Sequence, residues 1–180
     1  MSAPSSPSPR SASAESSVRA ARRRVRSAAT FARINAWTML IGALLAALLG
    51  FLHWEGFALG AALLICTALE FRGAAGLDRL DPGAPGRLAA NQFGLITLAW
   101  AYCLWRFFAA LSGTNPVIQQ AFEISRTGDP EYDDAMRSLL PLAAGIVYGV
   151  VALSVTLVCG VTAWYYLSRR GWVRQARAGA

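Results

Sequence analysis

The sequence predicts an all-α membrane protein, a four-helix transmembrane bundle with both termini in the cytoplasm. Two observations lead to this prediction. Four long apolar stretches alternate with hydrophilic segments, and a bilayer core roughly 30 Å thick requires about 18 or more apolar residues in each crossing helix. Fourteen of the seventeen basic residues, all except Arg106, Arg126 and Arg137, lie in the N-terminal segment, the central loop or the C-terminal tail. Basic residues concentrate in the cytoplasmic segments of membrane proteins, so the N-terminal segment, the central loop and the C-terminal tail are expected inside.

The N-terminal part combines a polar tail with a basic helix. Residues 1–17 are rich in Ser, Pro and Ala, which predicts a disordered tail. Residues 18–33 predict a basic juxtamembrane helix that continues into a first span over about 34–52. The basic region is too long for a cleaved signal peptide, so it is expected to remain as an anchor. Anionic lipid headgroups, rather than nucleic acid, are the expected ligands of its clustered arginines, Arg22, Arg23, Arg24 and Arg26.

The second and third spans flank a loop rich in glycine and proline. The second span, about 54–71, is the weakest, because its uncharged part over 56–69 reaches only ~21 Å as a helix. A re-entrant hairpin is therefore the alternative there. In the loop, Leu80-Asp81-Pro82 predicts a turn or a helix start. The third span, about 92–111, is rich in aromatic residues.

The last part of the chain contains an acidic link and the longest apolar stretch. Within the link, 117–124 predicts a short amphipathic helix, and Asp129-Pro130-Glu131 predicts the start of a helix that runs into the fourth span, 139–167. The membrane domain is thus expected over 34–168, followed by a basic cytoplasmic tail, 169–180. Arg169 and Arg170 open this tail and are expected at anionic headgroups.

Arg106 is the one charge inside a predicted span, in its outer part. A lone charge in the membrane is costly, so it finds a partner or extends to the interface. We expect Arg106 to reach the outer headgroups past Phe107 and Phe108, with Glu55 in the outer link as the alternative partner. A role with a substrate or ion is the third possibility.

Four polar residues meet at the inner ends of the second and third spans. Glu70 and Arg72 form a charged pair there, and Asn91 and Gln92 open the third span at the same level. We expect a structural cluster that fixes the hairpin between these spans. A proton-coupled transporter would also use a membrane carboxylate. Small multidrug-type transporters, however, place theirs in the middle of the first span, and this chain has no acid there.

Small residues recur at four-residue spacing, which places them on one face of each helix. Such faces allow close approach of helices in lipid, where packing drives association. We expect them to pack the bundle within one chain, with an oligomer interface as the alternative. The residues are Gly42, Ala46 and Gly50 in the first span, Gly56 and Gly60 in the second, and Gly145, Gly149, Ala152, Thr156 and Gly160 in the fourth.

No residue pattern points to a cofactor or to catalysis. His53 is the single histidine, and no ligand set with metal spacing accompanies it. Cys66, Cys103 and Cys159 lie inside apolar spans without a C-x-x-C motif, so we expect them to be packing residues. No glycine-rich phosphate loop or nucleophile–base pair is present in the sequence. We therefore expect no enzyme activity, cofactor or metal.

Part of the chain resembles a set of uncharacterised small bacterial membrane proteins. The resemblance covers 69–105 and depends on Glu70-Phe71-Arg72-Gly73, Leu80-Asp81-Pro82 and Asn91-Gln92 before an aromatic helix. It implies a small four-helix integral membrane protein and no particular activity.

These observations predict a non-enzymatic component of the bacterial inner membrane. An accessory, regulatory or structural subunit is favoured, which would contact lipid, a second copy or a membrane protein partner. The exclusive use of arginine indicates a GC-rich bacterial genome. The alternative function is a small oligomeric transporter or channel, although only five polar residues of the third and fourth spans would line a path: Thr97, Tyr102, Ser154, Thr156 and Thr162.

Overall fold

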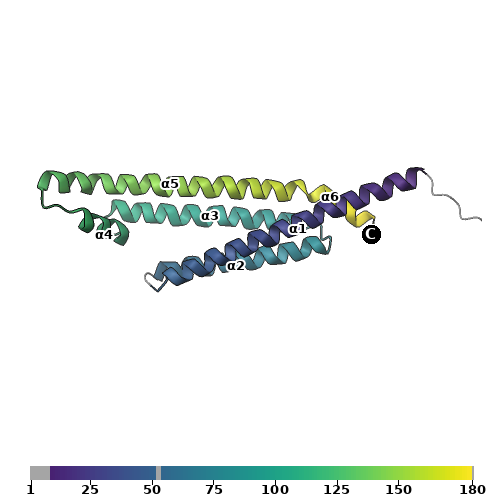
Figure 1. Ribbon diagram of the computed structural model, residues 1–180, viewed down its shortest axis with the longest axis horizontal. Coiled ribbons are helices and arrows are strands. Elements are labelled where there is room, and N and C mark those ends of the chain that lie inside the picture. The colour runs from purple at the N-terminus through teal and green to yellow at the C-terminus, as the bar shows by residue number, and fades with distance from the viewer. Residues whose placement is uncertain (1–8, 52–53, 180) are drawn as a thin grey trace, which may run out of the picture. The chain divides into compact units, whose positions relative to one another are not determined.

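The computed structural model describes residues 9–51 and 54–179, and these residues are almost entirely helical. By length and composition four of the helices are able to cross a membrane, which makes the chain an all-α, multi-pass membrane protein. Figure 1 shows the helices, which are α1 (Pro9–Leu49), α2 (Trp54–Asp78), α3 (Ala84–Leu111), α4 (Pro116–Ser125), α5 (Pro130–Ser168) and α6 (Arg170–Ala178).

The first helix begins earlier than the sequence predicts. Residues 1–8 and His53 lie outside the described residues, but α1 starts at Pro9, so the prediction of disorder is wrong for residues 9–17. Proline suits the first turn of a helix, where its missing N–H has no partner to lose. Two turns later Arg19 and Glu15 form an ion pair of 3.5 Å at i, i+4 spacing, which supports helix in this polar segment.

The second helix is unbroken and longer than its predicted span. It has 25 residues, which is about 37 Å at 1.5 Å per residue and exceeds the bilayer core. A re-entrant hairpin is therefore not needed to explain its short uncharged stretch. The helix gains length at its arginine-bearing end, where it continues past Glu70 and Arg72 to Asp78.

A tight turn joins α2 to α3. Leu80 has a positive φ of 56°, a left-handed conformation that is unfavourable for a leucine, and the Asp81 N–H closes the helix end on the Gly76 carbonyl at 2.9 Å. The Leu80 side chain packs against the buried core, which offsets the strain. Asp81 then accepts a hydrogen bond from the Gly83 N–H at 2.9 Å. The predicted turn is confirmed, but α3 begins at Ala84 rather than at Pro82.

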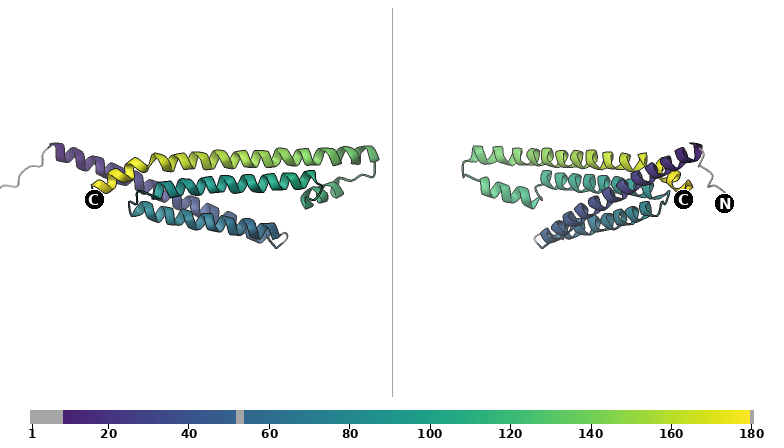
Figure 2. Two further views of the ribbon diagram at one scale, coloured as in Figure 1. Left: turned by 180° about the vertical axis from the view of Figure 1, so that it is seen from behind. Right: turned by 45° about the vertical axis from the view of Figure 1, so that its right-hand side comes forward.

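The chain divides into two compact units, described here separately. The first contains α1, α2 and α6, together with α3 up to Phe93 and α5 from Val161. In this unit α1 and α2 lie side by side (Figures 1 and 2). Glycines permit their close approach: a Cβ at Gly56 would lie 2.6 Å from the Ala46 carbonyl oxygen, and one at Gly60 would lie 3.0 Å from that of Ala43.

A buried core fills the arginine-bearing end of the first unit. Its members come from every helix of the unit and, apart from Tyr166, are small or aliphatic. They are Ala21, Val25, Ala28, Ala29, Ala32, Ala74, Leu77, Ala84, Leu88, Ala89, Ala163, Tyr166, Val173 and Ala176. Alanine dominates on α1, so the neighbouring helices approach its backbone closely. This core holds the basic segment of α1 against the ends of α2 and α3 and against α6.

The second unit contains α3 from Gly94, all of α4, and α5 up to Gly160. The two long helices lie side by side, with the Trp100 indole N–H donating to the Thr156 hydroxyl at 2.9 Å. The predicted short helix over 117–124 is confirmed as α4, and α5 begins at Pro130 and runs through the fourth span as expected.

Not every predicted small-residue position is a packing position. A Cβ at Gly145 would approach the Phe107 ring at 2.7 Å, so this glycine lies at a contact between α5 and α3. Gly42, Gly149 and Gly160 have no heavy atom within 4 Å of an added Cβ. The prediction that these three pack against a neighbouring helix of the same chain is therefore wrong. Spacing by four places residues on one face but does not say which turns meet a partner.

Candidate functional site

A buried carboxylate organises the first unit. Glu70 on α2 is fully buried, and its two oxygens accept hydrogen bonds from side chains of the three other long helices. Asn35 of α1 donates to Oε1 at 2.9 Å, and the Tyr166 hydroxyl of α5 donates to Oε1 at 2.6 Å. From α3, Asn91 donates to Oε2 at 2.7 Å and Gln92 lies 3.2 Å from both oxygens.

The structure confirms the predicted meeting of Glu70, Asn91 and Gln92, but it separates Arg72 from them. Arg72 lies two residues along the same helix and is exposed, because residues at i and i+2 face different directions. Within the described residues no arginine lies at salt-bridge distance from Glu70. Neutral donors therefore replace the cation that the sequence suggested.

Sequence reasoning missed two members of this site, Asn35 and Tyr166. Asn35 is the first polar residue after Arg33, at the start of the first span, and this was the available signal. Tyr166 stands in the run Trp164-Tyr165-Tyr166, which looks like an ordinary interfacial aromatic cluster. Only the packing of α5 against α2 distinguishes Tyr166, which is fully buried, from the exposed Trp164.

One polar atom of this cluster has no hydrogen-bond partner. The Asn91 amide nitrogen donates both to Glu70 and to the Cys66 carbonyl, at 3.0 Å, whereas its Oδ1 is buried without a donor. Buried acceptors of this kind are commonly satisfied by an internal water. The carboxylate itself is fully engaged by protein donors. The arrangement is therefore suited to holding helices together.

A second polar cluster lies in the second unit around Arg106. Its Nη2 donates to Asn115 Oδ1 at 3.0 Å, and Asn115 Nδ2 donates to the Arg106 carbonyl at 3.2 Å and to the Tyr148 hydroxyl at 3.3 Å. Arg106 is only 5% exposed. The expectation that its head reaches the outer headgroups is therefore wrong, because a polar partner is available closer to the helix.

Asn115 explains why this arginine stays buried. It is the N-cap of α4, with its Oδ1 also accepting from the Val117 N–H at 3.1 Å, and Pro116 follows at the first helical position. The Asn-Pro step was the sequence signal that could have identified this cap. Glu55 belongs to the first unit and Arg106 to the second, so their pairing stays a prediction.

Arginines cover the surface of the first unit at the end that contains the basic segment of α1, the turn between α2 and α3, and α6. Those predicted to contact lipid are all placed there, with Arg24 stacked over the Trp172 ring at 4.0 Å and Arg169 over the Tyr165 ring at 4.6 Å. Arg33 pairs with Asp78 at the end of α2. In the turn before α3, Arg87 pairs with Asp81, and together with the Gly83 N–H it holds the pKa of that carboxyl below its ordinary value.

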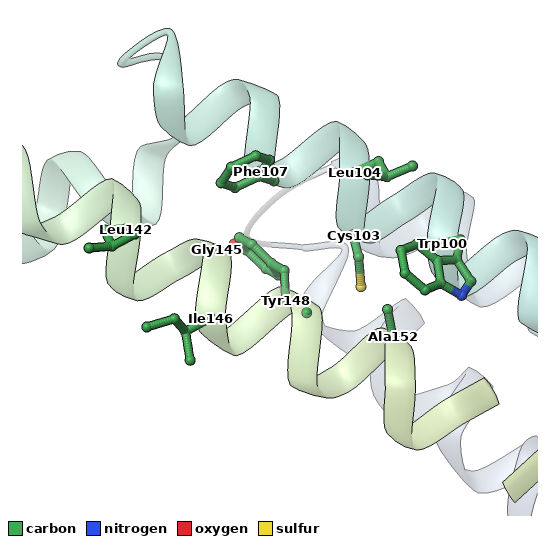
Figure 3. A pocket seen from close by; sticks show the side chains of 10 residues that line it. Trp100, Cys103, Leu104, Phe107, Leu142, Gly145, Ile146, Tyr148 and Ala152 are labelled. Atoms are coloured by element: carbon green, nitrogen blue, oxygen red, sulfur yellow. The ribbon is translucent and has the colours of Figure 1, made fainter. Parts of the chain in front are cut away.

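An apolar groove of about 300 Å³ lies between α3 and α5 in the second unit (Figure 3). Cys103 and Trp100 reach into it from α3, and Tyr148 and Ala152 line the α5 side. The open position at Gly149 contributes to the hollow. Cys103 and Cys159 are buried, as expected of packing residues.

Comparison with known proteins finds no family model, no curated protein and no solved structure that matches this chain.

Proposed function

We propose that this chain is a non-enzymatic component of the bacterial inner membrane, an accessory, regulatory or structural subunit with both termini in the cytoplasm. The observation that carries the proposal is the Glu70 cluster. A carboxylate whose two oxygens are engaged by Asn35, Asn91, Gln92 and Tyr166 serves as a fixed tie between four helices. Such a tie stabilises a scaffold rather than turning over a substrate.

The proposed orientation follows from the arginines. The N-terminal segment, the central turn and the tail are basic, whereas the link that contains α4 carries five acidic residues and two arginines. This asymmetry favours four crossings with the basic segments inside. In this orientation the arginines within a few residues of the Glu70 cluster members, such as Arg33, Arg72 and Arg169, lie at the inner headgroups. Their charge favours anionic lipid there.

A small oligomeric transporter or channel is the second candidate, and one observation favours it. Asn91 Oδ1 is a buried acceptor without a donor beside a membrane carboxylate. In a transporter, a proton or cation that reaches this cluster would displace one of the present donors. That exchange would require the Asn91 and Gln92 amides to turn their oxygens toward the site.

A flux assay separates the two candidates. The full chain is reconstituted in liposomes, and proton, sodium and potassium fluxes are recorded under an imposed gradient for the wild type and for Glu70→Gln. We expect fluxes equal to those of protein-free liposomes in both cases, while the unfolding temperature of Glu70→Gln falls. A wild-type flux that Glu70→Gln abolishes and Arg72→Gln retains would contradict a structural role and establish transport.

A further inference from the structure

The basic segment of α1 and the C-terminal helix α6 form a short two-helix extension, here called the stalk (residues 18–33 and α6). Val173 and Ala176 of α6 are fully buried, and the end of α6 lies beside the start of the segment. There Arg22 Nη2 donates to the Gly179 carbonyl at 3.3 Å. Figure 2 shows α6 lying along α1 where α1 leaves the region of α2.

The stalk cannot use an apolar face to bind a bilayer surface. Helices that lie on membranes insert their apolar side between headgroups. On α1 that side is made of Ala21, Val25 and the alanines that follow, each no more than 2% exposed, and on α6 it is Val173 and Ala176. Both faces are already covered by protein. Apart from Phe31, which is 41% exposed near the start of the apolar span, the stalk exposes polar or small residues, and most of these are arginines.

The stalk also extends beyond the headgroups in the proposed orientation. Arg22 precedes Ile34, the start of the apolar span, by twelve residues, which is about 18 Å of helix. The headgroup layer is only about 5–7 Å thick on each side, and a tilt of 40° still leaves Arg22 about 14 Å out. α1 has no proline or glycine between Glu15 and Ile41 that would bend it back.

The exposed arginines form two rows at helical spacing. Arg19, Arg23 and Arg26 stand at i, i+4 and i+7 on α1, so they share one face, and they are all exposed. Arg170, Arg174 and Arg177 repeat the same spacing on α6. Within the described part of the stalk and the residues before it, Glu15 is the carboxylate that pairs with these rows, at 3.5 Å from Arg19.

We propose that the stalk is a docking surface for an acidic helical segment of a partner protein. Carboxylates at i, i+4 and i+7 on such a segment match the spacing of each arginine row, and guanidinium groups bind carboxylates through two parallel hydrogen bonds. This inference rests on the proposed function in one respect, which is that the stalk lies in the cytoplasm, where a soluble or membrane-tethered acidic partner reaches it.

Nucleic acid fits the surface less well. Proteins that bind single strands combine a basic groove with exposed aromatic rings on which bases stack. The stalk contains two aromatic rings. Trp172 is half-buried and covered by the Arg24 guanidinium at 4.0 Å, and Phe31, 41% exposed, packs against Tyr165 with 5.2 Å between ring centroids, beyond the last arginine of the α1 row. The two rows lie on adjacent helices, α1 and α6. Neither arginine row has an uncovered aromatic ring between its members, and this charge spacing favours carboxylates on a helix.

The test uses the full chain in nanodiscs of neutral lipid, which leave both faces accessible. The probe is a fluorescent, alanine-rich helical peptide with glutamates at i, i+4 and i+7, and binding is followed by anisotropy. We expect saturable binding that weakens as salt rises. The variant Arg19→Gln/Arg23→Gln/Arg26→Gln should bind about tenfold more weakly, since three charge pairs are lost.

A control variant separates the stalk from net charge. Arg72→Gln/Arg126→Gln/Arg137→Gln loses the same three charges elsewhere and should bind the peptide as the wild type does. Arg19→Glu/Arg23→Glu/Arg26→Glu should bind a matching lysine peptide instead, which also shows that the stalk is folded.

Three results would overturn the inference. They are equal losses in the two glutamine variants, tighter binding of oligonucleotides of matched charge, and displacement of the peptide when anionic lipid is added to the discs. A reporter fused to the C-terminus tests the cytoplasmic location separately. A periplasmic tail would contradict the proposed function while leaving the peptide affinities informative.

Discussion

At the residue scale, the molecule is defined by how it accommodates charge inside apolar surroundings. A buried ion pair is costly to desolvate, and breaking one is worse. Glu70 accepts hydrogen bonds from neutral amides and a hydroxyl instead of pairing with an arginine. Each of these neutral groups costs less free energy to bury than a guanidinium cation does. Arg106 likewise donates to the Asn115 side chain, which is itself fully buried.

Removing one donor from Glu70 should weaken the helix tie measurably. We expect Tyr166→Phe to lower the free energy of unfolding by about 1–3 kcal/mol, because the buried Glu70 Oε1 loses one of its hydrogen-bond donors. Glu70→Leu should cost more, since several buried donors lose their acceptor together. Unfolding midpoints in mild detergent measure both. Arg72→Gln is the control and should change little; a similar loss there would deny the cluster its special role.

Arg106 should depend on Asn115 for its buried position. We expect Arg106→Gln and Asn115→Ala each to destabilise by about 1–3 kcal/mol, and the double variant by less than their sum, because the two side chains share one contact. A double-mutant cycle of unfolding midpoints measures the coupling. Repeating the cycle with Glu55→Gln tests the predicted ion pair, and strict additivity in both cycles would show that Arg106 acts with neither residue.

Asp81 should confer a small stability that depends on pH. The hydrogen bond from Arg87 lowers the pKa of Asp81 in the folded chain, so its contribution is present above the unfolded value of about 4 and is lost as pH falls through the lower folded value. Asp81→Asn should therefore lower the unfolding temperature at pH 7, and the difference should shrink below pH 4. A difference that grows on acidification would show the opposite pKa shift.

At the element scale, glycines decide how closely α1 and α2 approach each other. Gly56 leaves no room for a side chain, because the opposing atoms are backbone atoms of Ala46 in α1 and of Gly50 just after it, which cannot move aside locally. Gly145 meets a phenylalanine ring instead, which has some freedom to shift. Equal spacing in the sequence therefore conceals unequal packing in the folded chain.

Alanine substitutions should reveal this difference. Gly56→Ala should lower the unfolding temperature, because the new methyl group forces α1 and α2 apart. Gly149→Ala meets open space and should leave the temperature unchanged or raise it, since alanine favours helix by up to about 1 kcal/mol over glycine. Thermal unfolding of both variants in the same detergent compares them. A destabilising Gly149→Ala would indicate a neighbour that a second copy provides.

At the scale of the whole molecule, orientation is the most exposed prediction. A periplasm-active reporter fused after Thr127 should be active, whereas fusions after Gly83 and Ala180 should be inactive, because the arginines favour the cytoplasm. Enzyme activity normalised to fusion abundance measures this in cells. An active fusion at Gly83 would show that α2 does not cross the membrane. An active fusion at Ala180 alone would show the same for α5.

The sequence alone was sufficient for the four long helices and α4, although α1, α2 and α3 extend beyond their predicted ends and α6 was not predicted. Apolar length identified the four long helices, and local signals such as Asp129-Pro130 and the 117–124 pattern identified the start of α5 and the existence of α4. These features depend on residues close together in the chain. For the same reason the sequence reached Glu70, Asn91 and Gln92, which lie on two helices joined by one short turn.

Tertiary structure alone decided which distant residues complete each site. Asn35 and Tyr166 are 35 and 96 residues from Glu70, and nothing in their own neighbourhoods marks them as its partners. It also decided that α6 covers the apolar face of the basic segment, which turned an expected lipid-binding helix into a stalk with exposed arginines. The physical reason is that helix periodicity defines a face, whereas the neighbour that covers the face is selected only when separate helices pack together.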